Sequence, residues 1–483
     1  MTQLTQFTSG QFIAWLQAAR RPHVGLLRGD LFTIDSAWDA DLRTHGGLLH
    51  SIWSEHGGKR LVWTEEGCAT ELIRRSGTPG WEWVRSTATA WRVRHSAKGA
   101  AMPDSIAEAL ADVLSDIPAA RYALEATRLE AILAASTARG IRVDLKALQH
   151  THADMQRIQK QLRDTLGFDP LLEDNAAPTL AWLSQHGIDV PSIHSDDWGA
   201  RTTSGQPLAT EAERVYEQVL YLRRRFPKVR ELVAQVKRST LHSRFEPFAQ
   251  VSGRISSTRP ALNNIAADLR HLLVARPGHA LVTADFDGIE PRILAALSGD
   301  SILAEHLASG DPYADAAERA GFGRTTHRRA FKVVMISTMY GAGVGRTARQ
   351  LGVSLEEARR VRAALWQPYP RAQAWLREES GLQGATLDSG RPLGVVERPY
   401  ARPNLLIQST AYDVFQGAAL RVHDCLPAHS HIWMPLHDEL ILETPHRSVE
   451  AVKEVLGSLM PTEFRGVQIT ALPVELGPAW KKI

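Results

Sequence analysis

Two apolar, strand-like runs of this chain end on carboxylates that lie far apart in the sequence. One run leads into Asp285, and the other, which begins at Met434, leads into His437, Asp438 and Glu439. A side chain at a strand end leaves the sheet for solvent, and a carboxylate there can hold Mg²⁺ together with substrate phosphates. Either aspartate alone is more simply a turn or cap residue. The pair predicts a sheet assembled from distant segments and two-metal phosphoryl transfer.

The bulk composition is that of a soluble globular protein. At 483 residues the chain exceeds the usual size of one core, so about two to four domains are expected. It is 44% hydrophobic and 23% charged, which is ordinary for this class, and no apolar run approaches the ~18 residues of a membrane span. The net charge of +3 excludes a global polycation, so any surface for nucleic acid must be local.

Cysteine usage and the start of the chain favour a cytoplasmic protein. Cys68 and Cys425 are the two cysteines, and two cannot build a disulfide framework or a Cys-rich zinc site. The first ten residues lack the charged and apolar regions of a signal peptide. We therefore expect a cytoplasmic location and no membrane partner.

The predicted secondary structure changes near residue 118. Residues 1–118 alternate short strand-like runs with Ala-rich helical ones, which predicts a small α/β unit. Beyond them apolar residues recur at helical spacing, and Gly140 marks the end of the first helix. Three further segments are predicted: a polar amphipathic helix over residues 152–166, a loop over residues 187–208 and a long helix from Thr210 to about Leu241.

The last of these helices is locally basic. Between Tyr221 and Arg244 one acid, Glu231, stands against eight cations, which are Arg223, Arg224, Arg225, Lys228, Arg230, Lys237, Arg238 and Arg244. This excess favours contacts with phosphates, which position a nucleic acid without reading its sequence. The alternative is a solvated helix face. We expect Lys237 and Arg238 to contact DNA.

A second predicted helix has cationic, apolar and aromatic side chains along one face. Residues 326–341 read as a single helix that ends at a glycine. Within it Arg328, Lys332, Ile336 and Tyr340 are spaced by four, so all four lie on one face. Two cations, an apolar residue and an aromatic ring could grip a triphosphate at one end and a base at the other. The alternative is an amphipathic helix with a basic edge.

The glycines that follow this helix do not form a dinucleotide-binding loop. In the run from Gly341 through Gly343 to Gly345 the third glycine comes one residue early, and a helix rather than a strand precedes it. We interpret the run as a helix stop with a flexible turn.

Five elements of the chain, in one order, resemble those of family A DNA polymerases, the DNA polymerase I type. They are the segment leading into the palm (252–257 with 262–265), the first palm motif (285–300), the nucleotide-binding fingers helix (326–341), the Asn-x-x-x-Gln-x-Thr-Ala element (404–413) and the last palm motif (437–439). The resemblance covers about residues 119–483. It implies an α/β multidomain protein with the right-hand polymerase fold of palm, fingers and thumb, preceded by a small α/β domain.

The resemblance also implies a role for the motif residues. Asp285, Phe286 and Asp438 would bind two Mg²⁺ ions, for which Mn²⁺ can substitute, and Glu439 would support the second metal site. The catalytic residues would be Asp285, Asp438, Glu439 and the phosphate-binding Lys332.

Substrate contacts follow from the same resemblance. Arg328 and Lys332 would hold the β- and γ-phosphates of a dNTP. Tyr340 would stack at the insertion position, Ile336 would face the incoming sugar, and Glu290 would crowd a ribose 2′-hydroxyl. The residues implied to contact primer–template DNA are Arg254, Asn404, Gln408 and His437, which would test base-pair shape in the minor groove.

Several positions depart from the family pattern. Ile336 stands where the family has an aromatic residue, so it packs but cannot stack on a sugar. Gly288 replaces a glutamine and Pro435 a polar residue, which predicts looser primer–template contacts. Tyr122 to Ala126 resembles an element of the 3′–5′ exonuclease, but Ala126 replaces its metal-binding aspartate, and residues 1–118 contain no Asp-x-Glu. We therefore expect no proofreading, and no 5′-nuclease domain.

The expected organisation is a degenerate exonuclease-like domain (1–118), a helical thumb (119–244), a first palm segment (245–300), fingers (301–379) and a second palm segment (380–483). The expected function is that of a monomeric DNA polymerase that extends a primer on a DNA template with dNTPs. Two alternatives stay open. A single-subunit RNA polymerase shares the palm aspartates, although Glu290 argues against it, and a polymerase-like protein could bind DNA without catalysis.

Overall fold

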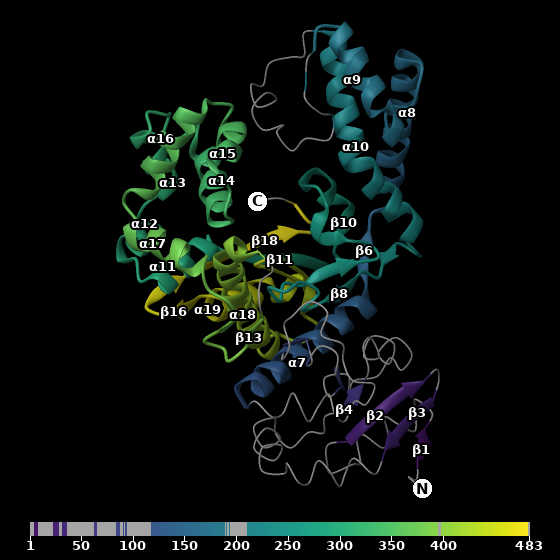
Figure 1. Cartoon of the computed structure of the whole chain (residues 1–483). Coiled ribbons are helices and arrows are strands. Elements are labelled where there is room, and N and C mark those ends of the chain that lie inside the picture. The colour runs from purple at the N-terminus through teal and green to yellow at the C-terminus, as the bar shows by residue number, and fades with distance from the viewer. Residues whose placement is uncertain are drawn as a thin grey trace.

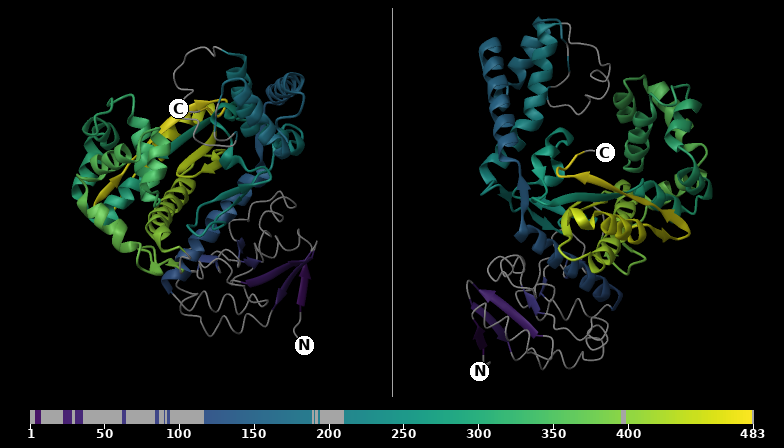
Figure 2. Two further views of the ribbon diagram at one scale, coloured as in Figure 1. Left: turned by 45° about the horizontal axis from the view of Figure 1, so that its top comes forward. Right: turned by 180° about the vertical axis from the view of Figure 1, so that it is seen from behind.

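The computed structural model describes residues 117–188, 190, 193, 210–394 and 398–481, together with residues 90, 92 and 93 and five N-terminal strands. Figure 1 shows two helical arms that rise from opposite ends of a central sheet, with the N-terminal strands on the far side of helix α7. Figure 2 shows the same arrangement from two further directions.

The central sheet has four antiparallel strands in the order β14-β15-β11-β18. Their bounds are β11 His279–Phe286, β14 His431–Leu436, β15 Glu439–Pro445 and β18 Ala471–Gly477. Residues 280–284 of β11 are all buried, as expected for a strand that is covered on both faces. The sheet is thus assembled from segments far apart in the sequence, as the two strand-ending aspartates predict.

Three helices lie against this sheet or against each other. Helix α19 (Val449–Leu459) packs on β11 and β18, and α7 (Ile117–Arg139) packs on β14 and on α18 (Arg402–Asp424). Helix α7 also packs on β8 (Arg244–Glu246) and on the N-terminal strand β5 (Val84–Ser86), so it links the N-terminal strands to the central sheet. Gly140 ends α7 as predicted, with a positive φ of 73°.

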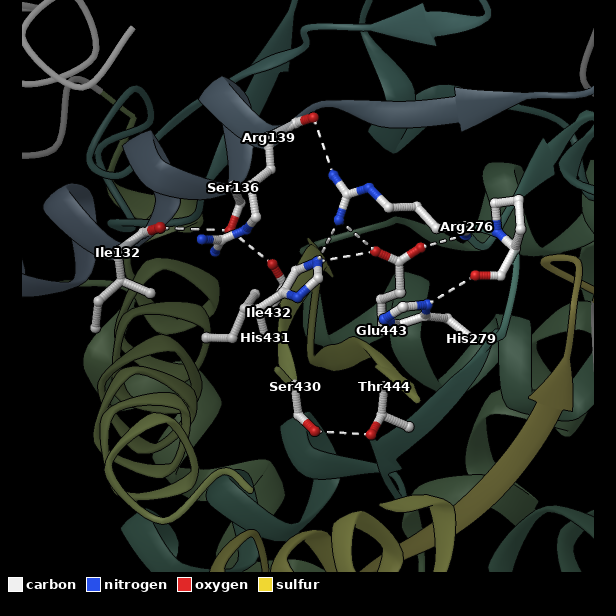
Figure 3. Close-up of polar contacts among 11 residues, drawn as sticks. Ile132, Ser136, Arg139, Arg276, His279, Ser430, His431, Ile432, Glu443 and Thr444 are labelled. Atoms are coloured by element: carbon white, nitrogen blue, oxygen red, sulfur yellow. Dashed lines mark hydrogen bonds and ion pairs between the residues drawn. The ribbon is translucent and has the colours of Figure 1, made fainter. Parts of the chain in front are cut away.

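A buried ionic network joins the end of α7 to the sheet (Figure 3). The Glu443 carboxylate on β15 accepts hydrogen bonds from the Arg276 guanidinium (2.9 Å) and from the Arg276 backbone N–H (2.6 Å). His431 Nε2 lies 2.9 Å from the same carboxylate. Arg276 also donates to the Arg139 carbonyl (3.1 Å) at the C-terminus of α7. Burial and the neighbouring Arg276 charge lower the pKa of Arg139 to about 10.

The first helical arm consists of α8 (Leu145–Leu166), α9 (Ala176–Gln185) and α10 (Glu211–Gln235). Thr210 and Glu213 form a reciprocal capping box at the start of α10. The predicted helix to Leu241 is too long, because Val236 adopts an extended backbone and residues 240–241 form strand β7. Of the predicted loop over residues 187–208, all but residues 187, 188, 190 and 193 lie outside the described residues.

Several cations of this basic run bind carbonyl or carboxylate groups of the same chain. Arg223 donates to the carbonyl of Pro170 (2.9 Å), and Arg225 pairs with Asp268 (2.5 Å). Lys228 donates to Glu231 and to the Ala261 carbonyl, and Arg244 pairs with Glu246 (2.8 Å). These four cations therefore have partners within the chain, and the count of charges alone does not reveal this.

The second helical arm carries the predicted one-stripe helix, which is α14. Its helices are α12 (Ser301–Ser309), α13 (Pro312–Arg319), α14 (Arg328–Met339), α15 (Val344–Leu351), α16 (Leu355–Trp366) and α17 (Pro370–Glu379). Helix α14 packs against α13, α15 and α16. Gly341 has a positive φ of 77° just after it, so the predicted helix stop is confirmed. Helix α11 (Ile289–Ser298) joins this arm to β11.

Nine further short strands of the described residues form small separate sheets. They are β6 (Ile141–Val143), β7 (Thr240–Leu241), β8 (Arg244–Glu246), β9 (Ser256–Thr258), β10 (Leu273–Val274), β12 (Ala385–Thr386), β13 (Pro392–Leu393), β16 (Thr462–Phe464) and β17 (Val467–Ile469). One buried core cluster runs from α7 through the first arm and the central sheet to α14.

The N-terminal strands form a separate five-stranded sheet in the order β1-β3-β2-β4-β5. The strands are β1 Leu4–Phe7, β2 His23–Arg28, β3 Leu31–Asp35, β4 Val62–Thr64 and β5 Val84–Ser86. The pairs β2–β4 and β4–β5 are parallel and the others antiparallel. The helical runs predicted between them lie outside the described residues.

Within the described part of the chain, no helix is long and apolar enough to cross a membrane.

Candidate active site

The central sheet brings the two predicted aspartates to one edge. Asp285 is the penultimate residue of β11 and lies opposite Glu439 across the β11–β15 pair. Asp438 lies in the tight turn between β14 and β15, next to His437, whose φ is 57°. The Phe286 backbone N–H donates to the Asp438 carbonyl (3.4 Å). Antiparallel pairing therefore places three carboxylates from two distant segments side by side.

These carboxylates repel one another. Asp285 is exposed to solvent at its side chain, yet the surrounding protein and the charges of Asp438 and Glu439 raise its pKa to about 7. Burial raises the pKa of Asp438 to about 6. Burial also raises the pKa of Glu439, although Thr283 donates a hydrogen bond to that carboxylate (2.7 Å). A divalent cation bound between the aspartates would relieve this repulsion.

The donor set fits Mg²⁺ bound with the help of a substrate. Nowhere in the described ranges do three His, Cys, Asp or Glu side chains already converge as a metal site. Two aspartates with further oxygens from phosphates match the usual coordination of Mg²⁺. Phe286 is 1% exposed, so its apolar side chain belongs to the core and only its backbone carbonyl could serve as a ligand.

One of the two cations of α14 acts on this acidic edge, and the other pairs with Asp311. The positive charge of Lys332 acts on Asp285 and opposes the rise in its pKa. Arg328 forms an ion pair with Asp311, the residue that caps α13. Both cations lie over the ring of Tyr313, with the Arg328 guanidinium carbon 5.7 Å and the Lys332 Nζ 6.0 Å from its centroid.

Asp311 and Tyr313 are functional neighbours that the sequence interpretation missed. Asp311 followed by Pro312 is a readable helix start, but nothing local indicates which cations will lie beside it. The Tyr313 ring is 5% exposed and its hydroxyl has no hydrogen-bond partner within the described structure. It lies 3.9 Å from where a Cβ on Gly288 would stand, which is ordinary van der Waals contact, so the positive φ of 56° rather than lack of space favours glycine there.

The C-terminal end of α14 meets the sheet through Tyr340. Its hydroxyl lies 2.9 and 2.8 Å from the two oxygens of Glu290 on α11. Arg254 forms an ion pair with the same carboxylate. Burial and the Glu290 charge raise the pKa of Tyr340 to about 12. Ile336 is half-buried on the same stripe.

The predicted DNA contacts fall into two groups. Asn404 and Gln408 lie one turn apart on α18, where Gln408 hydrogen-bonds Tyr340 and the buried Asn404 Oδ1 accepts no hydrogen bond in the described structure. Burial and then the Arg254 charge lower the pKa of His437, so this group gathers around Arg254 and Tyr340.

Lys237 and Arg238 lie elsewhere. They are exposed in the turn between α10 and β7, where Lys237 and Thr240 exchange two backbone hydrogen bonds of 2.9 Å. Arg238 has a positive φ of 49° there. The structure therefore separates them from the residues around Asp285.

Tyr122 and Ala126, which resemble an exonuclease element, are buried residues of α7. The Tyr122 hydroxyl donates to Asp413 of α18 (2.5 Å), and Ala126 is fully buried. Asp413 also pairs with the buried Arg391 (2.9 Å). An aspartate at position 126 would be enclosed by this packing, so the segment serves the contact between α7 and α18.

The chain is similar to known DNA polymerases. Residues 207–383 match the family model of DNA polymerase family A. The thermostable DNA polymerase I of Thermus aquaticus is 27% identical over 397 residues, which cover 72% of this chain and 46% of that protein. The DNA polymerase of Mycobacterium phage L5 is 30% identical over 240 residues, or 48% of this chain and 40% of that protein. The chain thus spans less than half the length of these curated relatives.

A solved structure shares the fold. It is described as the POL domain of Pol1 from M. smegmatis in complex with DNA primer-template and dNTP, and it covers 88% of this chain and 86% of its own, with a TM-score of 0.69 and 21% identity. The expected α/β right-hand polymerase fold is confirmed.

Proposed function

We propose that this chain, part of which matches the model of DNA polymerase family A, adds dNTPs to the 3′ end of a primer on a DNA template. The observation that carries the proposal is the meeting of Asp285 and Asp438 at one edge of the sheet with Lys332 of α14 facing them. In this proposal α8–α10 form the thumb, α12–α17 the fingers and the central sheet the palm. The partners are primer–template DNA and dNTPs, and the protein acts as a cytoplasmic monomer.

Asp285 and Asp438 would hold two Mg²⁺ ions, and Mn²⁺ could take their place. Bound there, the ions would acidify the primer 3′-hydroxyl and neutralise charge on the leaving pyrophosphate. Thr283 fixes one oxygen of Glu439, so Glu439 would add negative charge beside the metals without swinging into the substrate.

Arg328 and Lys332 would bind the triphosphate. Phosphoryl transfer needs positioning and charge stabilisation rather than a nucleophilic side chain, and two cations one turn apart supply both. Arg328 would exchange the Asp311 carboxylate for a phosphate oxygen, while the Tyr313 ring beneath both cations limits where their charges can go.

Glu290 would select the sugar. Tyr340 and Arg254 hold its buried carboxylate in place, so it cannot turn aside for a ribose 2′-hydroxyl. Ile336 would pack against the sugar without stacking, and Tyr340 would adjoin the templating base.

Arg254, Asn404, Gln408 and His437 would read the shape of the base pair at the primer terminus. Minor-groove acceptors are common to all base pairs, so these four side chains would donate N–H groups to them. Lys237 and Arg238 would contact the phosphates of the duplex from the base of the thumb.

The proposed enzyme would not proofread. The carboxylates that a 3′–5′ exonuclease needs are missing from residues 1–118 and from position 126, and two metals cannot be held without them. A mismatched primer terminus incubated with the protein and Mg²⁺ should stay intact, and trimming of that terminus would contradict this part of the proposal.

Primer extension tests the polymerase proposal. Asp285→Ala and Asp438→Ala should each abolish extension with Mg²⁺, because each removes a metal ligand. Glu454→Ala is the matched control, since Glu454 is an exposed carboxylate on α19, and it should keep full activity. Extension that survives either aspartate substitution would refute the site assignment.

The RNA polymerase alternative is tested on the same primed template. The fixed carboxylate of Glu290 favours dNTPs, so kcat/KM should be higher for a dNTP than for the matching rNTP. A preference for the rNTP would favour the alternative. No incorporation of either, with retained DNA binding, would indicate a non-enzymatic DNA-binding protein.

A further inference from the structure

Two exposed tyrosines lie next to each other where α14 ends. Of the large apolar side chains that are exposed in the described part of the chain, only Tyr340 (37% exposed) and Tyr400 (54%) are aromatic. Tyr340 follows the last residue of α14, and Tyr400 lies on the short 3₁₀ helix η6 (Pro399–Ala401) that leads into α18. Single exposed apolar residues are common on protein surfaces, but this pair gathers at one place.

Gly341 brings the two tyrosines together. A Cβ added to Gly341 would lie 3.3 Å from ring carbon Cδ2 of Tyr400 and 3.4 Å from its backbone oxygen. The backbone after Tyr340 therefore passes directly against the Tyr400 ring, and the φ of +77° at Gly341 also favours glycine. Tyr340 and Tyr400, from segments 60 positions apart in the numbering, thus face solvent on either side of one glycine.

One arginine contacts Tyr400, and two more are exposed on the helix that follows Gly341. The Arg398 guanidinium lies 3.4 Å from the Tyr400 hydroxyl. Arg346 and Arg349 are exposed on α15, which begins three residues after Gly341. Exposed aromatic rings interleaved with arginines are how proteins hold single-stranded nucleic acid, because bases stack on the rings and phosphates meet the cations.

We propose that Tyr400 stacks on the first unpaired template base beyond the insertion position, with Arg398 beside the adjoining phosphate. The inference rests on the proposed polymerase function, which gives Tyr340 its place beside the templating base and makes a single strand the natural occupant of the neighbouring surface. Tyr400 is then a positioning residue for the template strand. It touches neither the metals nor the triphosphate.

The test compares three variants that remove different properties of the side chain. Tyr400→Phe keeps the ring, Tyr400→Leu keeps apolar bulk without the ring, and Tyr400→Ala keeps neither. Leu355→Ala is the matched control, because Leu355 is equally exposed (54%) but lies at the start of α16. Affinity is measured, without dNTP or divalent ions, for two primed DNAs that differ only in the template overhang, which is absent in one and ten nucleotides long in the other. A 2-aminopurine at the first unpaired template position reports stacking by loss of fluorescence.

If the inference is correct, Tyr400→Ala and Tyr400→Leu weaken binding of the overhang DNA by about ten-fold, which is typical of one lost base–aromatic stack. They should leave binding of the blunt DNA unchanged and restore 2-aminopurine fluorescence. Tyr400→Phe and Leu355→Ala should behave as wild type. Equal loss on both DNAs, or a Leu variant that matches Phe, would overturn the assignment.

The two proposals can fail separately. If wild-type protein binds the overhang DNA through Tyr400 but adds no nucleotide, the polymerase proposal fails and the stacking assignment stands. If the protein extends primers while Tyr400→Ala leaves the overhang affinity and the fluorescence unchanged, the stacking assignment alone is wrong.

Discussion

The hydroxyl of Tyr340 lies within 2.9 Å of both carboxylate oxygens of Glu290, and this contact joins the helix that would carry the nucleotide to the helix that would select its sugar. The two residues come from α14 and α11. Arg254 completes the arrangement from a third segment. The position of the Glu290 carboxylate is therefore set from two sides.

Removing the Glu290 side chain should relax sugar selection. Glu290→Ala opens space for a 2′-hydroxyl, so the ratio of kcat/KM for a dNTP to that for the rNTP should fall by about ten-fold or more. Tyr340→Phe removes one of the two restraints on the carboxylate and should lower the same ratio by a smaller factor. Single-nucleotide incorporation kinetics measure both. An unchanged ratio in Glu290→Ala would remove Glu290 from sugar selection.

Replacing Tyr313 should weaken dNTP binding without changing the chemistry. Tyr313→Leu removes the ring beneath Arg328 and Lys332, and a cation–π contact at a partly exposed site contributes about 0.5–1 kcal/mol. The KM for dNTP should rise several-fold while kcat changes little. Tyr313→Phe is the control, because it keeps the ring and removes only a hydroxyl that has no partner in the described structure. It should match wild type in KM and be at least as stable.

Replacing Ile336 by an aromatic residue should increase contact with the incoming sugar. Ile336→Phe would present a flat ring from the same half-buried position of the α14 stripe, which can stack as well as pack. We expect kcat/KM for dNTPs to rise by about two- to five-fold, since an aromatic contact adds about 0.5–1 kcal/mol. A fall in kcat/KM with an unchanged melting temperature would show that Ile336 is already the best fit.

The Glu443 network should make folding stability depend on pH. Burial alone would raise the pKa of Glu443, but hydrogen bonds from His431 and the Arg276 backbone lower it below its ordinary value of 4.5. Burial lowers the pKa of His431 below 6.5. In both cases the unfolded chain binds protons more readily, so the free energy of unfolding should fall as the pH drops below about 6.5, and again below about 4.5.

Urea unfolding at several pH values tests this network. Glu443→Gln should lower the free energy of unfolding by about 1–2 kcal/mol at pH 7, because the half-buried Arg276 loses its counter-charge. The difference from wild type should shrink toward pH 4. Glu454→Gln, at an exposed position, should have no effect at any pH. A constant difference between pH 7 and pH 4 would contradict the assignment of the charge to Glu443.

Local chemistry made part of this site predictable. The strand ending at Asp285 and the helix of Arg328, Lys332, Ile336 and Tyr340 follow from side-chain periodicity, which neighbouring residues impose. The helix stop at Gly341 follows from the freedom of glycine at positive φ. The resemblance of five ordered motifs added the polymerase fold, which the family match and the shared structure confirm.

The basic run shows what neighbouring residues in the sequence cannot predict. Its charges were counted correctly, but Arg223, Arg225, Lys228 and Arg244 are held by carbonyls and carboxylates from other segments. Tyr122 likewise resembles part of a nuclease site, but in the structure its hydroxyl donates a hydrogen bond to Asp413. Whether a polar group serves a ligand or the fold depends on partners that periodicity cannot identify.

The sequence alone determined which residues end strands, which share a helix face and which motifs stand in polymerase order, because those properties depend on neighbours a few positions away. Only the tertiary structure decided that Asp285 meets Glu439, that Tyr313 lies under two cations and that Tyr400 joins Tyr340 at Gly341. Such contacts join segments that are far apart in the chain, and they form only when the whole core packs.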